Sequence, residues 1–209
     1  MRRISPVHMP LGAEKTEIRN HFEVVLSYGK KTSNASVVDL SHVSKWEIET
    51  GNLDDAMDGT GLTLPSQSNK AALFPDRTLC RMTPSRALIW NFDGGEESLW
   101  LQESAFNDVT DGSALLFMTG QGLLSIMEQL TDVKLDLVNG DSLRFAQCPL
   151  VGVPAKIVVG INKIHQMGMF VSVARGFGQS VIDTLLLAGK EIGLAPAGEE
   201  VFSQWLEKY

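Results

Sequence analysis

The sequence predicts an α+β fold made of two similar units in tandem, with largely antiparallel sheets and helices packed on them. Two observations carry this expectation. Residues 37–51 recur without gaps at residues 106–120, and short strand-like and helix-like runs alternate without a long parallel βαβ pattern. We therefore expect a first unit over residues 1–100 and a second unit, with carboxy-terminal helices, over residues 101–209.

The repeat consists of an Asp–aliphatic–hydroxyl triplet followed by a strand and a glycine. Residues 39–41 (Asp-Leu-Ser) match residues 108–110 (Asp-Val-Thr) at an offset of 69 residues. Gly51 and Gly120 correspond in the same way and should end the two strands. Because Asp, Ser and Thr side chains bond to nearby backbone amides, each triplet predicts a tight turn.

The first copy contains a pair that resembles catalytic machinery. Asp39 and His42 can be imagined as a histidine base and the carboxylate that orients it. The second copy has Asp111 where the first has His42. Capping of the turn is therefore the better interpretation of both Asp39 and Asp108.

The strands that follow the two triplets differ in pattern. Residues 45–49 alternate polar and apolar side chains, which is typical of a half-buried strand. Residues 114–118 are continuously apolar, as in a strand covered on both faces. The helical spacing of apolar residues then predicts a helix over residues 121–130, with a poorer counterpart over residues 53–57.

A second match at nearly the same offset concerns two predicted hairpins. The first spans residues 79–92 and turns around residues 83–85, and the second spans residues 146–161 and turns around residues 152–154. Pro84 corresponds to Pro154, at an offset of 70 residues, so a single gap relates this match to the first one.

The end of the chain predicts a strand and two helices. A strand over residues 170–174 leads to a helix over residues 180–193, and a linker over 195–198 leads to a last helix over 199–209. The aromatic rings of this last helix can pack on their own domain or on a partner, and Arg175 can hold an anion or a partner's carboxylate. The candidate interface residues are Arg175, Phe177, Phe202, Trp205 and Tyr209.

Composition and motifs narrow the function classes. With 18 basic and 25 acidic residues, a net charge of −7 argues against a nucleic-acid partner. The sequence has no apolar run of about 20 residues and no signal-peptide pattern, so we expect no membrane partner and a cytoplasmic location. Cys80 and Cys148 are expected to be reduced packing residues.

We find no signature of a catalytic, cofactor or metal site in this chain. The four histidines lack the spacing of metal ligands. Residues 120–122 (Gly-Gln-Gly) begin like a dinucleotide loop, but Ser125 stands where that motif has its third glycine.

Several of these segments resemble one protein family. Residues 39–51 resemble the folate-binding aminomethyltransferase superfold. Residues 108–110, 123–124 and 135–137 look more specifically like the gamma subunit of heterotetrameric sarcosine oxidase. The stretch 170–178 (Phe-Val-Ser-Val-Ala-Arg-Gly-Phe-Gly) is similar to the segment before that family's last long helix.

This resemblance implies a non-catalytic structural subunit that binds no cofactor itself. FAD, FMN, NAD and tetrahydrofolate would belong to larger partner subunits that oxidatively demethylate sarcosine. Two alternatives remain open: a free-standing folate-binding protein of one-carbon metabolism, and the small subunit of an N-methylglutamate dehydrogenase. The lysine–glycine–cysteine–tyrosine motif of the superfold's carrier proteins is absent from the sequence.

Overall fold

The computed structural model describes residues 2–29, 33–58, 60–93, 105–137 and 143–209. The predicted boundary between the two units, near residue 100, lies outside these ranges. In chain order the elements are β1 (Lys15–Arg19), β2 (Phe22–Ser27), β3 (Ala35–Asp39), β4 (Ser44–Glu49), α1 (Leu53–Met57), β5 (Lys70–Leu73), β6 (Arg77–Thr83), β7 (Arg86–Asn91), β8 (Phe106–Asp108), the 3₁₀ turn η2 (Thr110–Gly112), β9 (Ser113–Gly120), α2 (Leu123–Met127), β10 (Leu143–Leu150), β11 (Val153–Ile161), β12 (Met167–Ala174), the 3₁₀ turn η3 (Arg175–Phe177), α3 (Gly178–Ala188), β13 (Leu194–Pro196) and α4 (Glu199–Leu206).

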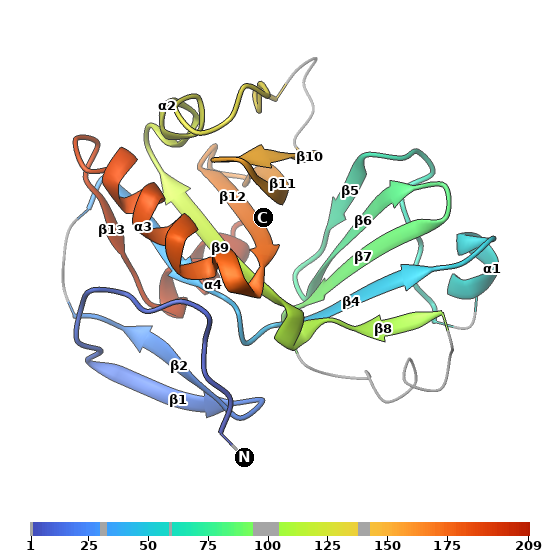
Figure 1. Cartoon of the computed structure of the whole chain (residues 1–209), viewed down its shortest axis with the longest axis horizontal. Coiled ribbons are helices and arrows are strands. Elements are labelled where there is room, and N and C mark those ends of the chain that lie inside the picture. The colour runs from blue at the N-terminus through green and yellow to red at the C-terminus, as the bar shows by residue number, and fades with distance from the viewer. Residues whose placement is uncertain (1, 30–32, 59, 94–104, 138–142) are drawn as a thin grey trace.

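The strands form two large sheets and one hairpin (Figure 1). The six-stranded sheet has the order β10-β11-β12-β9-β3-β13, and the five-stranded sheet has the order β5-β6-β7-β4-β8. Strands β1 and β2 pair only with each other among the described residues. All pairs are antiparallel except β13 with β3. The predicted α+β class with largely antiparallel sheets is therefore confirmed.

Apolar residues arrange the sheets and helices in layers. Helices α2 and α3 cover one face of the six-stranded sheet, where Val181, Ile182 and Leu185 pack on its strands. Helix α4 and the five-stranded sheet lie on the opposite face. Helix α1 covers the outer face of the five-stranded sheet. Among the helices of the described ranges, none is long and apolar enough to cross a bilayer.

The two copies of the repeat run side by side in opposite directions and cross from one large sheet to the other. Residues 35–39 pair with residues 116–120 in the six-stranded sheet. Residues 46–48 pair with residues 106–108 in the five-stranded sheet. Each large sheet therefore takes a strand from both predicted units, and the two sheets are joined where these segments cross.

Corresponding residues make corresponding turns at this crossing. The amide of Ser41 donates to Asp39 Oδ1 over 2.9 Å, and the amide of Thr110 donates to Asp108 Oδ1 over 2.8 Å. The capping role predicted for both aspartates is confirmed.

The hydroxyl groups of the two triplets then lock one copy to the other. Ser41 Oγ accepts the backbone amide of Leu115 over 3.2 Å, and Thr110 Oγ1 accepts that of Lys45 over 3.0 Å. Each hydroxyl thus satisfies a buried amide in the opposite copy, where an unpaired donor would be costly.

Most elements predicted from the sequence are present, with some differences at their ends. Both hairpins are confirmed, although the second turns at residues 151–152 instead of 152–154. Residues 114–118 are fully buried on both faces, as expected. The predicted helix 180–193 runs from 178 to 188 instead, and the amide of Leu194 then donates to the carbonyl oxygen of Gly189 over 2.9 Å.

Three further expectations need correction. The predicted linker 195–198 contains part of β13, whose backbone pairs with β3. The predicted helix 121–130 is confined to the five residues of α2. Lys45, expected on the exposed side of a half-buried strand, is completely buried because it lies at the crossing of the two copies.

The two glycines of the repeat occupy different environments, which gives a matched test. Gly120 has a φ of +123°, and a Cβ there would lie 2.4 Å from the Asn34 carbonyl oxygen, whereas a Cβ at Gly51 would meet nothing within 4 Å. We expect Gly120→Ala to lower the free energy of unfolding by about 2 kcal/mol or more, and Gly51→Ala to change it by less than about 1 kcal/mol. Urea denaturation measures both, and equal losses would contradict the strain at Gly120.

Candidate functional site

The crossing of the two copies holds a buried lysine. Lys45 is fully buried, and its Nζ donates to the carbonyl oxygens of Ser41 (2.7 Å) and Val43 (2.8 Å). Burial lowers the pKa of Lys45 to about 7, although the nearby carboxylates of Asp39 and Asp108 favour its charged form. The ammonium therefore closes the turn through main-chain bonds.

A second buried polar group joins three distant segments. The carboxylate of Glu199, at the start of α4, contacts His42 Nε2 (3.1 Å) and Arg19 Nη1 (2.6 Å). Burial raises the pKa of Glu199, but the hydrogen bond from His42 and the charge of Arg19 outweigh it, so this pKa lies below its usual value. The ionised carboxylate requires His42 Nε2 to donate, which fixes the tautomer of the ring.

These bonds decide the role of His42. Its ring is hydrogen-bonded to Glu199, whereas Asp39 is engaged by Ser41 and Ser5. The two residues do not form a base and its orienter. His42 instead connects the turn of the first copy to α4, and Arg19 extends this connection to the β1–β2 hairpin.

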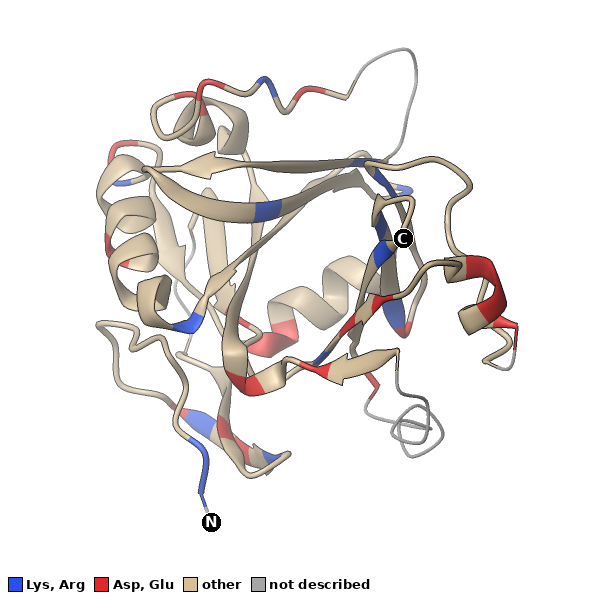
Figure 2. Ribbon diagram, turned by 45° about the vertical axis from the view of Figure 1, so that its right-hand side comes forward, with Lys and Arg blue, Asp and Glu red and all other residues tan. Residues whose placement is uncertain are grey.

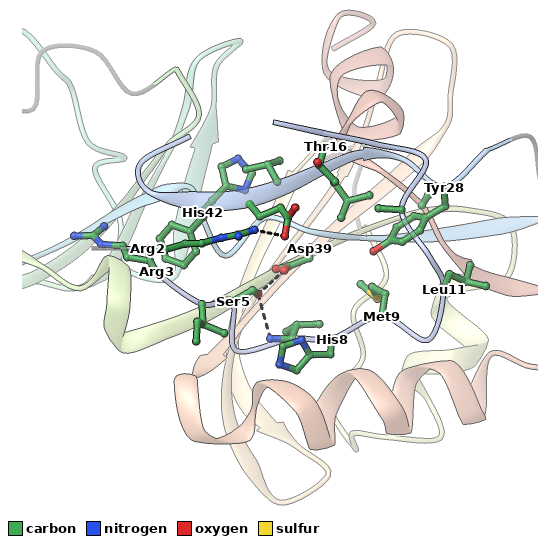
Figure 3. A pocket seen from close by; sticks show the side chains of 18 residues that line it. Arg2, Arg3, Ser5, His8, Met9, Leu11, Thr16, Tyr28, Asp39 and His42 are labelled. Carbon is green, nitrogen blue, oxygen red and sulfur yellow. Dashed lines mark hydrogen bonds and ion pairs between the residues drawn. The ribbon is translucent and has the colours of Figure 1, made fainter. Parts of the chain in front are cut away.

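A pocket of about 570 Å³ lies between the amino-terminal segment, the β1–β2 hairpin and the crossing (Figure 3). Ser5 Oγ donates to Asp39 Oδ2 over 2.5 Å and accepts the amide of Val7 over 3.1 Å. Tyr28 lines the opposite side, where burial and the charge of Asp39 raise its pKa to about 12. This tyrosine therefore stays a protonated phenol at neutral pH.

A groove of about 570 Å³ opens between the two large sheets on the side of β11 and β12. Both charged residues that line it, Glu47 and Lys156, form an ion pair with each other across the sheets. Cys148 also lines it, and burial raises the pKa of this thiol, so it is a poor nucleophile.

Two of the candidate interface residues lie near the surface at η3. Arg175 donates to the carbonyl oxygen of Ile4 and lies 4.0 Å from the carboxylate of Asp111, so it holds the amino-terminal segment within this chain. The ring of Phe177 is 46% exposed. Of these two candidates, Phe177 is the one that presents an apolar side chain at the surface.

The other three candidates lie on or after α4, away from η3. Phe202 and Trp205 are 3% and 1% exposed and pack in the interior of this chain. Trp205 Nε1 donates to the carbonyl oxygen of Gln166 (3.0 Å), and its ring fills the space beside Gly168. Tyr209 is partly buried against Trp205.

Aromatic rings fill the space between the two large sheets. Neighbouring rings have centroids 5.0 to 6.3 Å apart. The rings are those of Trp90, Phe92, Phe117, Phe170, Phe202 and Trp205. Such contacts contribute stability beyond the burial of their area, so this part of the interior serves packing.

The described residues hold no group of three or more histidine, cysteine or acidic side chains placed to bind a metal. The Gly-Gln-Gly segment precedes α2, but the side chain of Ile192 fills the space beside Gly122. Figure 2 shows basic and acidic residues interspersed along the described chain.

Sequence reasoning missed Lys45, Glu199 and the amino-terminal pocket. Lys45 follows an ordinary alternating pattern, and Glu199 matches a normal first-turn acidic residue of a helix. Lys45 is buried by the long-range pairing of the two copies, and Glu199 is buried where α4 packs beside His42 and Arg19, so neither burial can be read from the local sequence.

No family model and no curated protein matches the sequence. The structure is similar to a chain of a heterotetrameric sarcosine oxidase from Corynebacterium sp. U-96, solved in complex with pyrrole 2-carboxylate. The TM-score is 0.64 at 11% sequence identity, and the alignment covers 78% of this chain and 87% of that chain. The likeness is therefore one of fold.

The buried lysine predicts a pH dependence of stability. With a folded pKa of about 7, Lys45 has released its proton at pH 8, whereas the unfolded lysine, with a pKa near 10.5, keeps it. The unfolded state then binds more protons, so stability rises with pH above about 7, by at most about 1.4 kcal/mol per pH unit.

Urea denaturation between pH 6 and pH 8.5 should show this rise in the wild type and not in Lys45→Met. Lys190→Met, which removes an exposed lysine, serves as the control and should keep the wild-type dependence. Identical pH dependence in all three proteins would contradict the assignment.

Proposed function

We propose that this chain is a non-catalytic, gamma-type structural subunit of a cytoplasmic sarcosine oxidase-like complex that oxidatively demethylates sarcosine. FAD, FMN, NAD and tetrahydrofolate would be held by its larger partner subunits. The observation that carries the proposal is the likeness in fold to a chain of a heterotetrameric sarcosine oxidase.

The extent of that likeness supports a role as a whole subunit. The alignment covers most of both chains, 78% of this one and 87% of the other. These shares imply that the neighbouring chain is of similar size, so the comparison joins two small chains of matching architecture. The gamma-type assignment itself rests on the sequence motifs at residues 108–110 and 170–178.

The interior of the chain favours a scaffold over a catalyst. Two of its buried charged side chains are used for internal bonds: Glu199 holds His42 and Arg19, and Lys45 binds main-chain carbonyl groups. Aromatic rings fill the part of the space between the large sheets that lies next to α4. Groups committed in this way contribute to rigidity and are poorly placed to exchange protons with a substrate.

The test is co-expression with the larger subunits of a sarcosine oxidase-like complex, followed by affinity purification and measurement of sarcosine turnover. We expect the subunits to co-purify with this chain and the complex to oxidise sarcosine. A chain that purifies alone would overturn the proposal. Turnover of N-methylglutamate without sarcosine would instead assign it to the dehydrogenase, and tetrahydrofolate binding by the isolated chain would favour the free-standing folate protein.

The exposed ring of Phe177 provides a sharper prediction. Phe177→Asp should reduce the amount of co-purified partner at least tenfold, because a central apolar anchor contributes more than about 1.4 kcal/mol to an interface. Leu187→Asp is the matched control, since Leu187 is 74% exposed on the adjacent α3. Both substitutions are at the surface, and their melting temperatures should stay close to that of the wild type.

Pull-down yields of the two variants, compared at equal expression, show whether Phe177 contacts the partner. Equal yields from both would show that the surface around η3 is not the partner surface.

A further inference from the structure

The amino-terminal pocket carries an inference that does not depend on the proposed subunit role. Its volume of about 570 Å³ lies within the range of small-molecule sites. Its walls combine charged groups with apolar side chains, among them Met9, Leu11 and Val24. Which of these charged groups already form ion pairs within the chain determines the charge of the molecule that the pocket can bind.

Both arginines that line the pocket are engaged within the chain. Arg2 pairs with Glu23, which leaves that carboxylate neutralised. The guanidinium group of Arg3 lies 3.3 Å from a carboxylate oxygen of Asp111 and stacks over the ring of Phe22. The charge of each arginine is therefore balanced by a carboxylate of this chain.

Two carboxylates line the pocket, and Asp39 is the one that is not paired with an arginine of the pocket wall. It accepts hydrogen bonds from the amide of Ser41 and the hydroxyl of Ser5, and within the described residues it forms no ion pair. The nearby ammonium of Lys45 donates to the carbonyl oxygens of Ser41 and Val43 instead. Each carboxylate oxygen has more than one acceptor position, so both can take a further donor.

Tyr28 supplies a second acceptor and an aromatic face. Figure 3 shows its hydroxyl group pointing into the pocket on the side that faces Asp39. In the described part of the chain this hydroxyl makes no hydrogen bond, and the ring is partly buried. A cation held by Asp39 can therefore receive a second polar contact from Tyr28 and lie near a ring face, which attracts positive charge.

We propose that this pocket binds a small organic cation, a protonated amine with short apolar substituents. The ammonium group donates to the Asp39 carboxylate and to the Tyr28 hydroxyl, and the substituents pack against Met9 and its apolar neighbours. A Ca²⁺ or Mg²⁺ ion fits less well, because these ions take six or more oxygen ligands and this wall offers few. An anion would be repelled by the nearby carboxylate of Asp39.

The experiment follows backbone amide signals of the full ¹⁵N-labelled chain during titration with diethylammonium chloride. We expect saturable shifts for the amides of Ser5, Val7 and Ser41, with a Kd on the order of 1 mM for so small a probe. The neutral isostere diethyl ether and the anion acetate should bind at least tenfold more weakly. Ether binding as tight as diethylammonium would overturn the proposal, since charge would then not matter.

The repeat provides a matched pair of variants. Asp39→Asn keeps an oxygen that can cap the amide of Ser41 but removes the charge, and it should weaken diethylammonium binding at least tenfold. Asp108→Asn makes the same change in the corresponding cap of the second copy, and Asp108 does not line the pocket. Its affinity should equal that of the wild type, and equal affinity of both variants would refute the assignment.

Tyr28→Phe tests the site without altering a cap. The loss of one hydrogen bond to a charged group should weaken binding about threefold or more. If Asp39→Asn fails to fold, this variant decides alone: a reduced affinity supports the site and an unchanged one rejects it.

Discussion

The structure depends on the antiparallel pairing of the two corresponding segments at the centre of the chain. Strands β3 and β4 run in one direction, strands β8 and β9 run in the other, and each pair crosses from one large sheet to the other. The hydroxyls of Ser41 and Thr110 accept amides from the opposite segment at the crossing point. Because both sheets share this junction, neither can be built fully from its own half of the sequence.

This junction explains what could be predicted and what could not. The turns at residues 39–41 and 108–110 follow from local chemistry, in which a side chain accepts a hydrogen bond from an amide two residues away. The sequence pattern was therefore sufficient to predict them. The exchange of strands between sheets depends on pairs of residues that lie 58 to 85 positions apart. The burial of Lys45 is a consequence of that exchange, and a polar–apolar alternation cannot distinguish it from a surface lysine.

The aromatic residues of α4 show the same limit of prediction from the sequence. Their spacing predicted a helix with one apolar face, and α4 has it. The sequence left open whether that face meets this chain or a partner. Phe202 and Trp205 both lie on this chain's own strands, and the Trp205 ring fits there because β12 carries Gly168, whose missing side chain leaves room for it. A glycine in a strand is a weak signal until its neighbour across the sheet is known.

The amino-terminal segment makes the two copies unequal. Ser5 bonds Asp39 of the first triplet, Arg3 pairs with Asp111 after the second, and Arg175 holds the carbonyl of Ile4 between them. Asp111 corresponds to His42 in the repeat, and His42 is bonded instead to Glu199 of α4. At this one differing position, each copy thus binds a different flanking segment. The amino-terminal segment therefore covers one side of the junction, and the pocket lies between this segment and the junction.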